Sequence, residues 1–221
     1  FGKAIAIICD FEKLEEVEIK FARECIVDGW HRSIAETVNF RVEVLELLFT
    51  SVAQAEKVKS ITIKNLQDHM EERVFESRDF KTVRGRLTQL HLQIATEHDD
   101  EAPEYNIDKL ACHEGFGHGL PEYWLKPLLN QLTHLTLFGL TCTWGIWPFV
   151  DLRNIGTLPR LKSLSLGKFA IAHDWQVDWI VSHAYTLEEL ILDDCPIVTA
   201  LHLLEDQTIP NFPDLPVANK G

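Results

Sequence analysis

Residues 161–166 read LKSLSL, and this short stretch decides how the chain folds. Leu164 and Leu166 are two positions apart, which puts both side chains on one face of a β-strand. Five other segments repeat the pattern of an apolar residue, two variable positions, an apolar residue, one variable position and a last apolar residue. They are Leu14, Val17 and Ile19; Val58, Ile61 and Ile63; Leu87, Leu90 and Leu92; Leu132, Leu135 and Leu137; and Leu187, Leu190 and Leu192. A single short strand cannot bury its apolar face, whereas stacked copies can.

The spacing of these segments favours a repeat architecture. Consecutive copies begin 26 residues apart between Leu161 and Leu187, and 45 apart between Leu87 and Leu132. The shorter spacings lie close to the range of about 20–29 residues that is typical of leucine-rich repeats. The sequence therefore predicts an α/β, leucine-rich-repeat-like solenoid of irregular repeat length, with parallel strands and helices on the convex side. Residues 1–205 are expected to form this repeat domain, and residues 206–221 an irregular C-terminal tail.

Helical periodicity occupies the segments between the strands. Ser33 and Glu36 fit a capping box that begins a helix of about 20 residues. Pro121 is predicted in the first turn of a second helix, and Asp174 as the N-cap of a third. Residues 71–84 are expected to form a weaker, more charged helix. The first dozen residues are expected to be helical, with these side chains facing inward: Ile5, Ile8 and Phe11.

Composition excludes several function classes. The formal net charge is −13, which argues against a nucleic-acid partner because phosphate binding needs concentrated Lys and Arg. No stretch approaches the roughly 18–20 apolar residues of a membrane span, so no membrane association is expected. The five cysteines form no CxxC pair, which is typical of reduced thiols in a cytoplasmic or nuclear protein.

Neither a catalytic centre nor a metal site is predicted, and no cofactor motif is present. Cys112, His113, Glu114 and His118 lie within seven residues, but the two histidines are five apart and would face different sides of a helix. Gly115 and Gly117 also disfavour a helix there, so residues 115–119 are expected to be a polar loop. Residues 97–103, EHDDEAP, are expected to form a solvated acidic loop.

The aromatic segment TWGIWPFV, residues 143–150, permits two interpretations. Trp144, Trp147 and Phe149 could pack in the core, which is the usual role of aromatic residues, or could anchor a protein partner. Asp193 is expected to point outward from the last strand, and Cys195 to fill an apolar corner after it.

The strand positions between the apolar residues are the candidate binding surface. Because strand side chains alternate, these residues must share the face opposite the leucines. Adjacent strands lie about 4.8 Å apart, so the residues would form one continuous strip. A broad, neutral, hydrogen-bonding strip suits a protein segment better than a small metabolite. The predicted partner-binding residues are Lys64, Gln89, His91, Gln93, His134, Thr136, Phe138, Ser163 and Ser165.

Residues 161–197, LKSLSLGKFAIAHDWQVDWIVSHAYTLEELILDDCPI, resemble the C-terminal repeats of fungal F-box proteins. The upstream runs WLKPLLNQLTHLTLFGL and WGIWPFVDLRNIGTLPRL are similar to the same family. The resemblance implies the substrate-recognition part of a cullin-RING (SCF-type) ubiquitin ligase, a non-enzymatic subunit that holds a protein substrate near the catalytic subunits. No F-box is recognisable in this sequence. Binding of a Skp-type adaptor and cullin is therefore expected only if an F-box lies upstream of Phe1, and the alternative is a repeat scaffold with no ubiquitin role.

Overall fold

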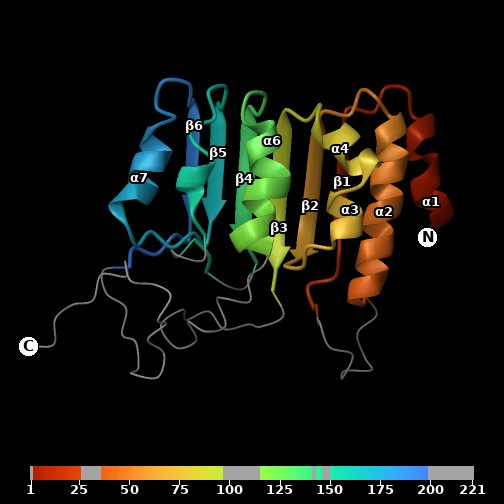
Figure 1. Cartoon of the computed structure of the whole chain (residues 1–221), viewed down its shortest axis with the longest axis horizontal. Helices are drawn as coiled ribbons and strands as arrows, with labels where there is room; N and C mark the ends of the chain where they lie inside the picture. The colour runs from red at the N-terminus through yellow and green to blue at the C-terminus, as the bar shows by residue number, and fades with distance from the viewer. Residues whose placement is uncertain (1, 26–35, 97–114, 141–142, 146–149, 199–221) are drawn as a thin grey trace, which may run out of the picture.

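Six parallel strands form one sheet in the order in which they occur along the chain (Figure 1). The computed structural model describes residues 2–25, 36–96, 115–140, 143–145 and 150–198. The strands are β1 (Glu16–Lys20), β2 (Ser60–Gln67), β3 (Gln89–Ala95), β4 (His134–Gly139), β5 (Ser163–Gly167) and β6 (Glu189–Asp193). Sequential order means that each strand lies beside the next strand of the sequence, as the repeated pattern predicts.

The register of the sheet aligns the six apolar triplets. The middle residue of each triplet pairs with the middle residue of the next, which gives the row Val17, Ile61, Leu90, Leu135, Leu164 and Leu190. In β1–β5 the side chains of this row are buried, whereas Leu190 on β6 is exposed. The prediction of an α/β fold with a parallel sheet is therefore confirmed, and so is the assignment of all six strands.

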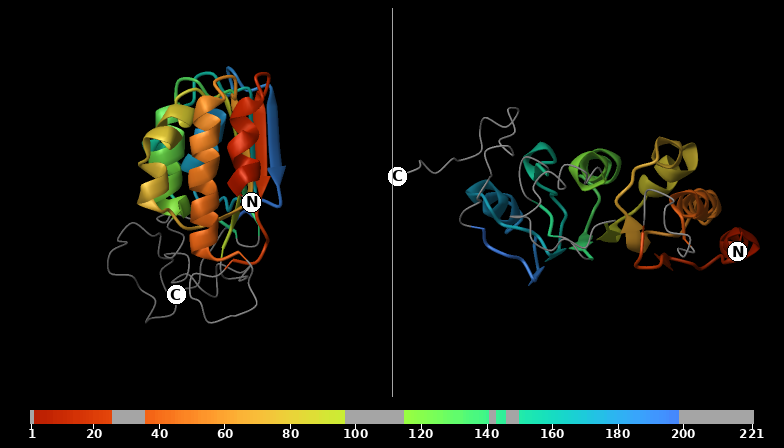
Figure 2. Two further views of the ribbon diagram at one scale, coloured as in Figure 1. Left: turned by 90° about the vertical axis from the view of Figure 1, so that its right-hand side faces the viewer. Right: turned by 90° about the horizontal axis from the view of Figure 1, so that it is seen from below.

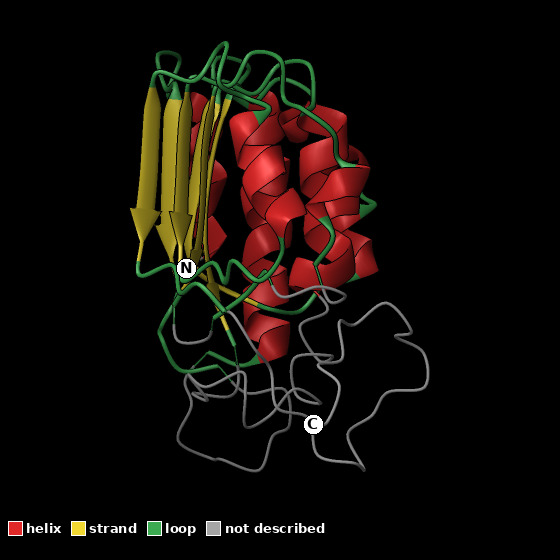
Figure 3. Cartoon of the chain, turned by 90° about the vertical axis from the view of Figure 1, so that its left-hand side faces the viewer, coloured by secondary structure: helices red, strands yellow, loops and turns green. Residues whose placement is uncertain are grey.

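Helices cover one face of the sheet and leave the other face open (Figures 2 and 3). The α-helices are α1 (Gly2–Ala6), α2 (Val38–Gln54), α3 (Glu72–Phe75), α4 (Arg78–Arg84), α6 (Lys126–Leu128) and α7 (Asp174–Val181). The described residues also form two 3-10 helices, η1 (Ile7–Asp10) and η3 (Leu152–Asn154), and the π-helix η2 (Gly115–Leu125). Because the triplets of β1–β5 pack in one apolar cluster with residues of these helices, the core lies between the two layers.

An aromatic cluster joins the helices over the middle of the sheet. Phe80 of α4 contacts Phe49 of α2, Phe75 of α3 and Trp124 of η2, with ring centroids 4.9, 5.1 and 4.8 Å apart. All three contacts are edge-to-face, the arrangement that the charge distribution of aromatic rings favours. This cluster fixes the helix layer against β2–β4.

Helix α2 begins later than the capping box predicted. Its N-cap is Thr37, whose hydroxyl accepts a hydrogen bond from the Phe40 amide at 3.3 Å. Ser33 lies outside the described residues. Glu36 accepts a hydrogen bond from the Ala22 amide at 2.6 Å and pairs with Arg41, so it serves a contact between distant segments and not a local cap.

The glycine-rich segment 115–119 is helical, which corrects the prediction of a loop there. It forms the first part of η2, and Pro121 lies inside that helix and not in its first turn. Burial explains the difference, since Leu120, Trp124 and Leu125 are all fully covered. Gly119 is required by close packing: a Cβ at this position would lie 2.2 Å from Cγ of Met70.

Smaller differences have local causes. The predicted helix over residues 71–84 is divided into α3 and α4. Ser77 is the N-cap of α4, because its hydroxyl accepts a hydrogen bond from the Phe80 amide. Helix α7 begins at Asp174, and its N-cap is His173, not Asp174 as predicted. At the N-terminus Ile5 is buried as expected, but Phe11 is 57% exposed because the helix ends before it.

Several predictions concern residues outside the described part of the chain. They include the acidic loop 97–103, the tail 206–221, and Cys112, His113, Glu114, Trp147 and Phe149. Within the described part, no helix has the length and apolar character required to cross a bilayer.

Candidate protein interface on the open face of the sheet

The nine predicted partner-binding residues all come from strands β2–β5, where they follow the alternation opposite the leucines. We call them the polar strip: Lys64, Gln89, His91, Gln93, His134, Thr136, Phe138, Ser163 and Ser165. The strand register brings them together in rows across the sheet. One row contains Gln89, His134 and Ser163, and the next contains His91, Thr136 and Ser165. The helices among the described residues lie on the opposite face, and none of them covers the strip (Figure 3).

His91 lies near the centre of the strip and is half-buried. Its Nδ1 lies 2.7 Å from the Thr136 hydroxyl on the neighbouring strand, which holds the ring in place. Burial lowers the pKa of His91, because desolvation disfavours the charged imidazolium. Glu16 opposes this shift of the pKa, and His134 adds to it. The lowered pKa favours the neutral form of His91, which offers hydrogen-bonding groups without charge.

His134 is oriented by a chain of hydrogen bonds that begins at Thr88, immediately before β3. The Thr133 hydroxyl donates to the Thr88 carbonyl oxygen at 2.9 Å and lies 2.9 Å from His134 Nδ1. A hydroxyl has one hydrogen to donate, so Nδ1 of His134 must be the donor in the second bond. In the neutral ring, Nε2 then carries the free lone pair, and it can accept a hydrogen bond from a partner.

Phe138 lies across the neighbouring strand, over Gly167. A Cβ at position 167 would lie 2.7 Å from Cγ of Phe138, so any larger residue there would displace the ring. The ring is half-buried by this contact and still occupies the open face. Phe138 therefore provides the large apolar group of the strip, as predicted, but it also contributes to packing between β4 and β5.

Lys64 is separated from the other members by a β-bulge. The register of β2 against β3 shifts between Ile63 and Leu66, and Asn65 adopts a positive φ of 58°. The Lys64 ammonium donates to Glu18 on β1 at 2.7 Å. This ion pair belongs to the acidic margin of the strip more than to its neutral centre.

Acidic side chains border the strip on both sides. Glu16 and Glu18 are exposed on β1, and Glu189 and Asp193 are exposed on β6. Ser163 donates to Glu189 at 2.6 Å, which ties the last row of the strip to this margin. A partner that covers the whole width of the sheet would meet a neutral centre between two negative borders.

Ser165 is less accessible than the sequence suggested. It lies on the predicted face, but it is only 7% exposed. Its register neighbours are Thr136 and Ile191, whose larger side chains rise above a serine hydroxymethyl group. Ser165 therefore contributes to the floor of the strip and not to its contact surface. Alternation predicts the face of a residue, but not the height of its neighbours.

Sequence reasoning missed a buried arginine beside the sheet. Arg41 of α2 is 3% exposed, and its guanidinium donates to the carbonyl oxygens of Ala22, Glu24 and Asn65 at 2.8, 2.8 and 2.9 Å. Burial lowers the pKa of Arg41, whereas nearby Glu36 partly opposes that shift. The only sequence signal was a basic residue on the apolar side of a predicted helix.

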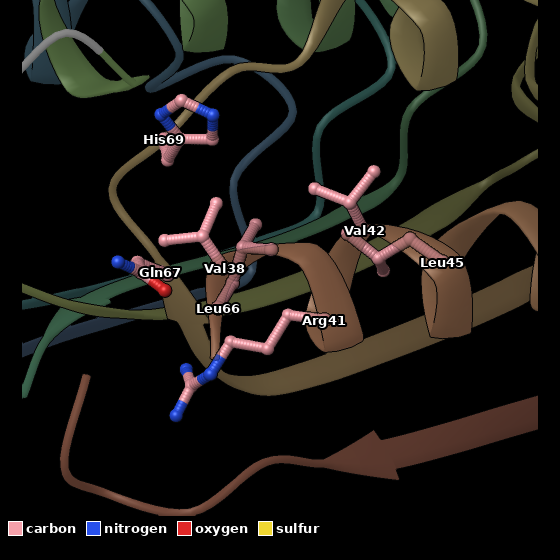
Figure 4. Close-up of a pocket in the computed structure, with 7 residues that line it drawn as sticks. All are labelled: Val38, Arg41, Val42, Leu45, Leu66, Gln67 and His69. Atoms are coloured by element: carbon pink, nitrogen blue, oxygen red, sulfur yellow. The ribbon is translucent and has the colours of Figure 1, made fainter. Parts of the chain in front are cut away.

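A small cleft adjoins Arg41 (Figure 4). Its lining residues are Val38, Arg41, Val42, Leu45, Leu66, Gln67 and His69. Neither amide atom of the buried Gln67 has a hydrogen-bond partner, and the same holds for Nε of Arg41. The volume is about 10 Å³, close to the roughly 10–15 Å³ that one water molecule requires. This cleft is therefore too small for a metabolite.

The remaining candidate sites are structural where they can be described. Trp144 is buried and donates its indole N–H to the Gly167 carbonyl oxygen at 2.8 Å, so for this residue the packing interpretation is confirmed. Cys195 is partly buried against the core, and Asp193 is exposed, as predicted. Among the described residues, no three His, Cys, Asp or Glu side chains form a group that could hold a metal ion.

Comparisons with protein-family models, curated proteins and solved structures find no match for this chain.

Proposed function

We propose that this chain is a leucine-rich-repeat-like protein-binding domain that recognises its partner through the polar strip. The proposal is carried by one observation: six parallel strands stand in sequential order with their triplets in register. Stacked repeats of one supersecondary unit produce this arrangement, and they expose a continuous surface for binding. Residues 1–205 would then act as one solenoid.

The chemistry of the strip favours a polypeptide partner. Gln89, Gln93 and the two histidines can donate and accept hydrogen bonds, and Phe138 supplies an apolar contact. The strip spans four strands without a metabolite-sized cavity among its described residues, whereas small-molecule sites are concave and enclosed. Protein interfaces combine aromatic anchors with neutral hydrogen-bonding groups in this way.

Within this class, we propose that the partner is a substrate of an SCF-type ubiquitin ligase. The resemblance of residues 161–197 to fungal F-box proteins supports this assignment. The domain itself would not be an enzyme; it would raise the effective concentration of substrate lysines near the catalytic subunits. An F-box upstream of Phe1 would recruit a Skp-type adaptor and cullin. A cytoplasmic or nuclear location fits the free thiols of Cys9 and Cys195.

Site-specific photo-crosslinking in cells tests both levels of the proposal. A photoreactive amino acid at Gln93 samples the strip, and the same amino acid at exposed Thr82 on α4 is the matched control on the helix layer. We expect proteins that crosslink from position 93 and not from position 82. Equal crosslinking from both positions would contradict the assigned surface.

The ligase assignment is tested separately with the full-length protein, including any upstream sequence. We expect adaptor and cullin to co-purify with it in stoichiometric amounts. Retention of the position-93 partner without adaptor or cullin would instead support a repeat scaffold with no ubiquitin role.

A further inference from the structure

Strand β6 has the same sequence pattern as its neighbour but a different environment. Leu190 and Leu192 pair in register with Leu164 and Leu166 of β5. The β5 leucines are fully buried, whereas Leu190 and Leu192 are each 45% exposed. Val181 at the end of α7, which lies at the same end of the sheet, is 60% exposed (Figure 1). These three side chains leave apolar surface exposed at this end of the sheet, and exposed apolar surface is typical of docking sites.

The backbone of β6 is also open on this side. The Glu189 amide donates to the Lys162 carbonyl oxygen, and the Asp193 carbonyl oxygen accepts from Lys168, so odd-numbered residues of β6 face β5. Backbone groups alternate direction along a strand. The N–H and C=O groups of Leu190 and Leu192 therefore point away from β5, where β6 has no neighbouring strand in the described sheet.

We propose that this edge binds an extended segment of a partner protein, which adds to the sheet as a further strand. An added strand would form hydrogen bonds with the N–H and C=O groups of Leu190 and Leu192 that point away from β5. The added strand would direct alternate apolar side chains over Leu190 and Leu192. This surface is distinct from the polar strip, so the inference does not depend on the proposed function.

Charge defines the chemistry of the partner strand. Glu189 and Asp193 are exposed on the open face of β6, and neither has an ion-pair partner among the described residues. The whole chain carries a net charge of −13. Residues of the added strand that face the same side as Glu189 and Asp193 should therefore be Lys or Arg, because opposite charges stabilise cross-strand pairs and like charges destabilise them.

The same charges disfavour a second copy of this chain as the occupant. If β1 of another copy continued the register, Glu16 would stand beside Glu189, and α1 flanks β1 at that end (Figures 1 and 2). An antiparallel pair of β6 strands related by a two-fold axis at Ile191 would place Glu189 beside Asp193. Both arrangements bring acidic side chains together.

Peptide binding to the full chain tests the proposal. The probe is a seven-residue peptide of alternating Lys and Val; the controls are a Glu/Val peptide with the same alternation and a shuffled Lys/Val peptide. We expect the alternating basic peptide to bind at least tenfold more tightly than either control, measured by fluorescence anisotropy. Equal affinity for the shuffled peptide would show that charge alone, and not strand addition, explains the binding, and would overturn the proposal.

Two variants locate the binding at β6. Leu190→Pro removes an N–H that points away from β5 and should abolish binding, while Leu190→Ala keeps that N–H and should retain most of it. The double variant Glu189→Gln and Asp193→Asn should weaken binding at least fivefold without changing the melting temperature. Unchanged binding by Leu190→Pro would contradict the proposal.

Hydrogen exchange of the free protein provides an independent measurement. The amides of Leu190 and Leu192 should exchange much faster than those of Ile191 and Asp193, and the basic peptide should slow them. Slow exchange of the Leu190 and Leu192 amides without peptide would mean that the edge is already paired. A concentration-dependent dimer that Leu190→Pro abolishes would assign the edge to a second copy of the chain. Either result would overturn the proposal.

Discussion

Replacing equivalent leucines on β5 and β6 by alanine should have unequal costs. Leu164 is fully buried between Leu135 and Leu190, so Leu164→Ala removes apolar contacts and leaves a cavity. Such substitutions lower the free energy of unfolding by about 3–4 kcal/mol. Leu190 occupies the same register position but is 45% exposed. Water can fill the space that Leu190→Ala leaves, so no empty cavity forms. The substitution removes only about half of the free energy of burying a leucine side chain, and the free energy of unfolding should fall by about 1 kcal/mol.

Urea denaturation monitored by tryptophan fluorescence measures both free energies. The two variants should differ by about 2–3 kcal/mol. Their m-values should equal that of the parent protein, because equal m-values show that the same surface is exposed on unfolding. Leu135→Ala on β4 is the matched control and should resemble Leu164→Ala. An equal loss for Leu190→Ala would refute the reasoning, since it would mean that the Leu190 side chain is as buried as that of Leu164.

Three further predictions concern other contacts. Arg86 donates to the carbonyl oxygens of Val52 and Ala55 at the end of α2, so Arg86→Ala should lower the free energy of unfolding by about 2 kcal/mol, and thermal melting checks this. Burial lowers the pKa of His183, whose Nε2 accepts the Leu158 amide at 3.0 Å. The contribution of His183 to stability should therefore be fully present above its unfolded-state pKa of about 6.5. It should be lost as the pH drops toward the folded-state pKa, because the unfolded chain binds the proton first. Urea unfolding between pH 7.5 and 5 should show a smaller fall in the free energy of unfolding for His183→Gln than for the parent protein. Gly167→Ala should cost about 1–3 kcal/mol by displacing the Phe138 ring, and the loss should shrink when Phe138→Ala is combined with it, as a double-mutant cycle can measure.

The polar strip illustrates both the success and the limit of sequence reasoning. Period-two alternation correctly assigned all nine residues to one strand face, because that periodicity is a property of the extended backbone itself. It did not reveal that Ser165 is only 7% exposed, or that the Lys64 ammonium is paired with Glu18 on β1. Those outcomes depend on which side chains stand on the adjacent strand.

The helix layer was harder to predict than the sheet. Ser33 and Glu36 satisfy a local capping pattern, yet Thr37 caps α2 and Glu36 contacts Ala22 and Arg41. Glycine content favoured a loop near residue 115, yet that segment enters a helix. In these cases, contacts between residues distant in the sequence outweigh local capping and helix preferences, which amount to about 1–2 kcal/mol at most.

The amino-acid sequence by itself determined the six strands, their parallel order and the two faces of the sheet. These features follow from a repeated pattern that only stacking can bury. The tertiary structure alone decided that Arg41 is buried against three backbone carbonyl oxygens, and that β6 remains exposed although it carries the same leucine pattern as β5. The physical reason is that burial depends on what lies beside a residue in space, and a strand at the edge of a sheet has a neighbour on one side only.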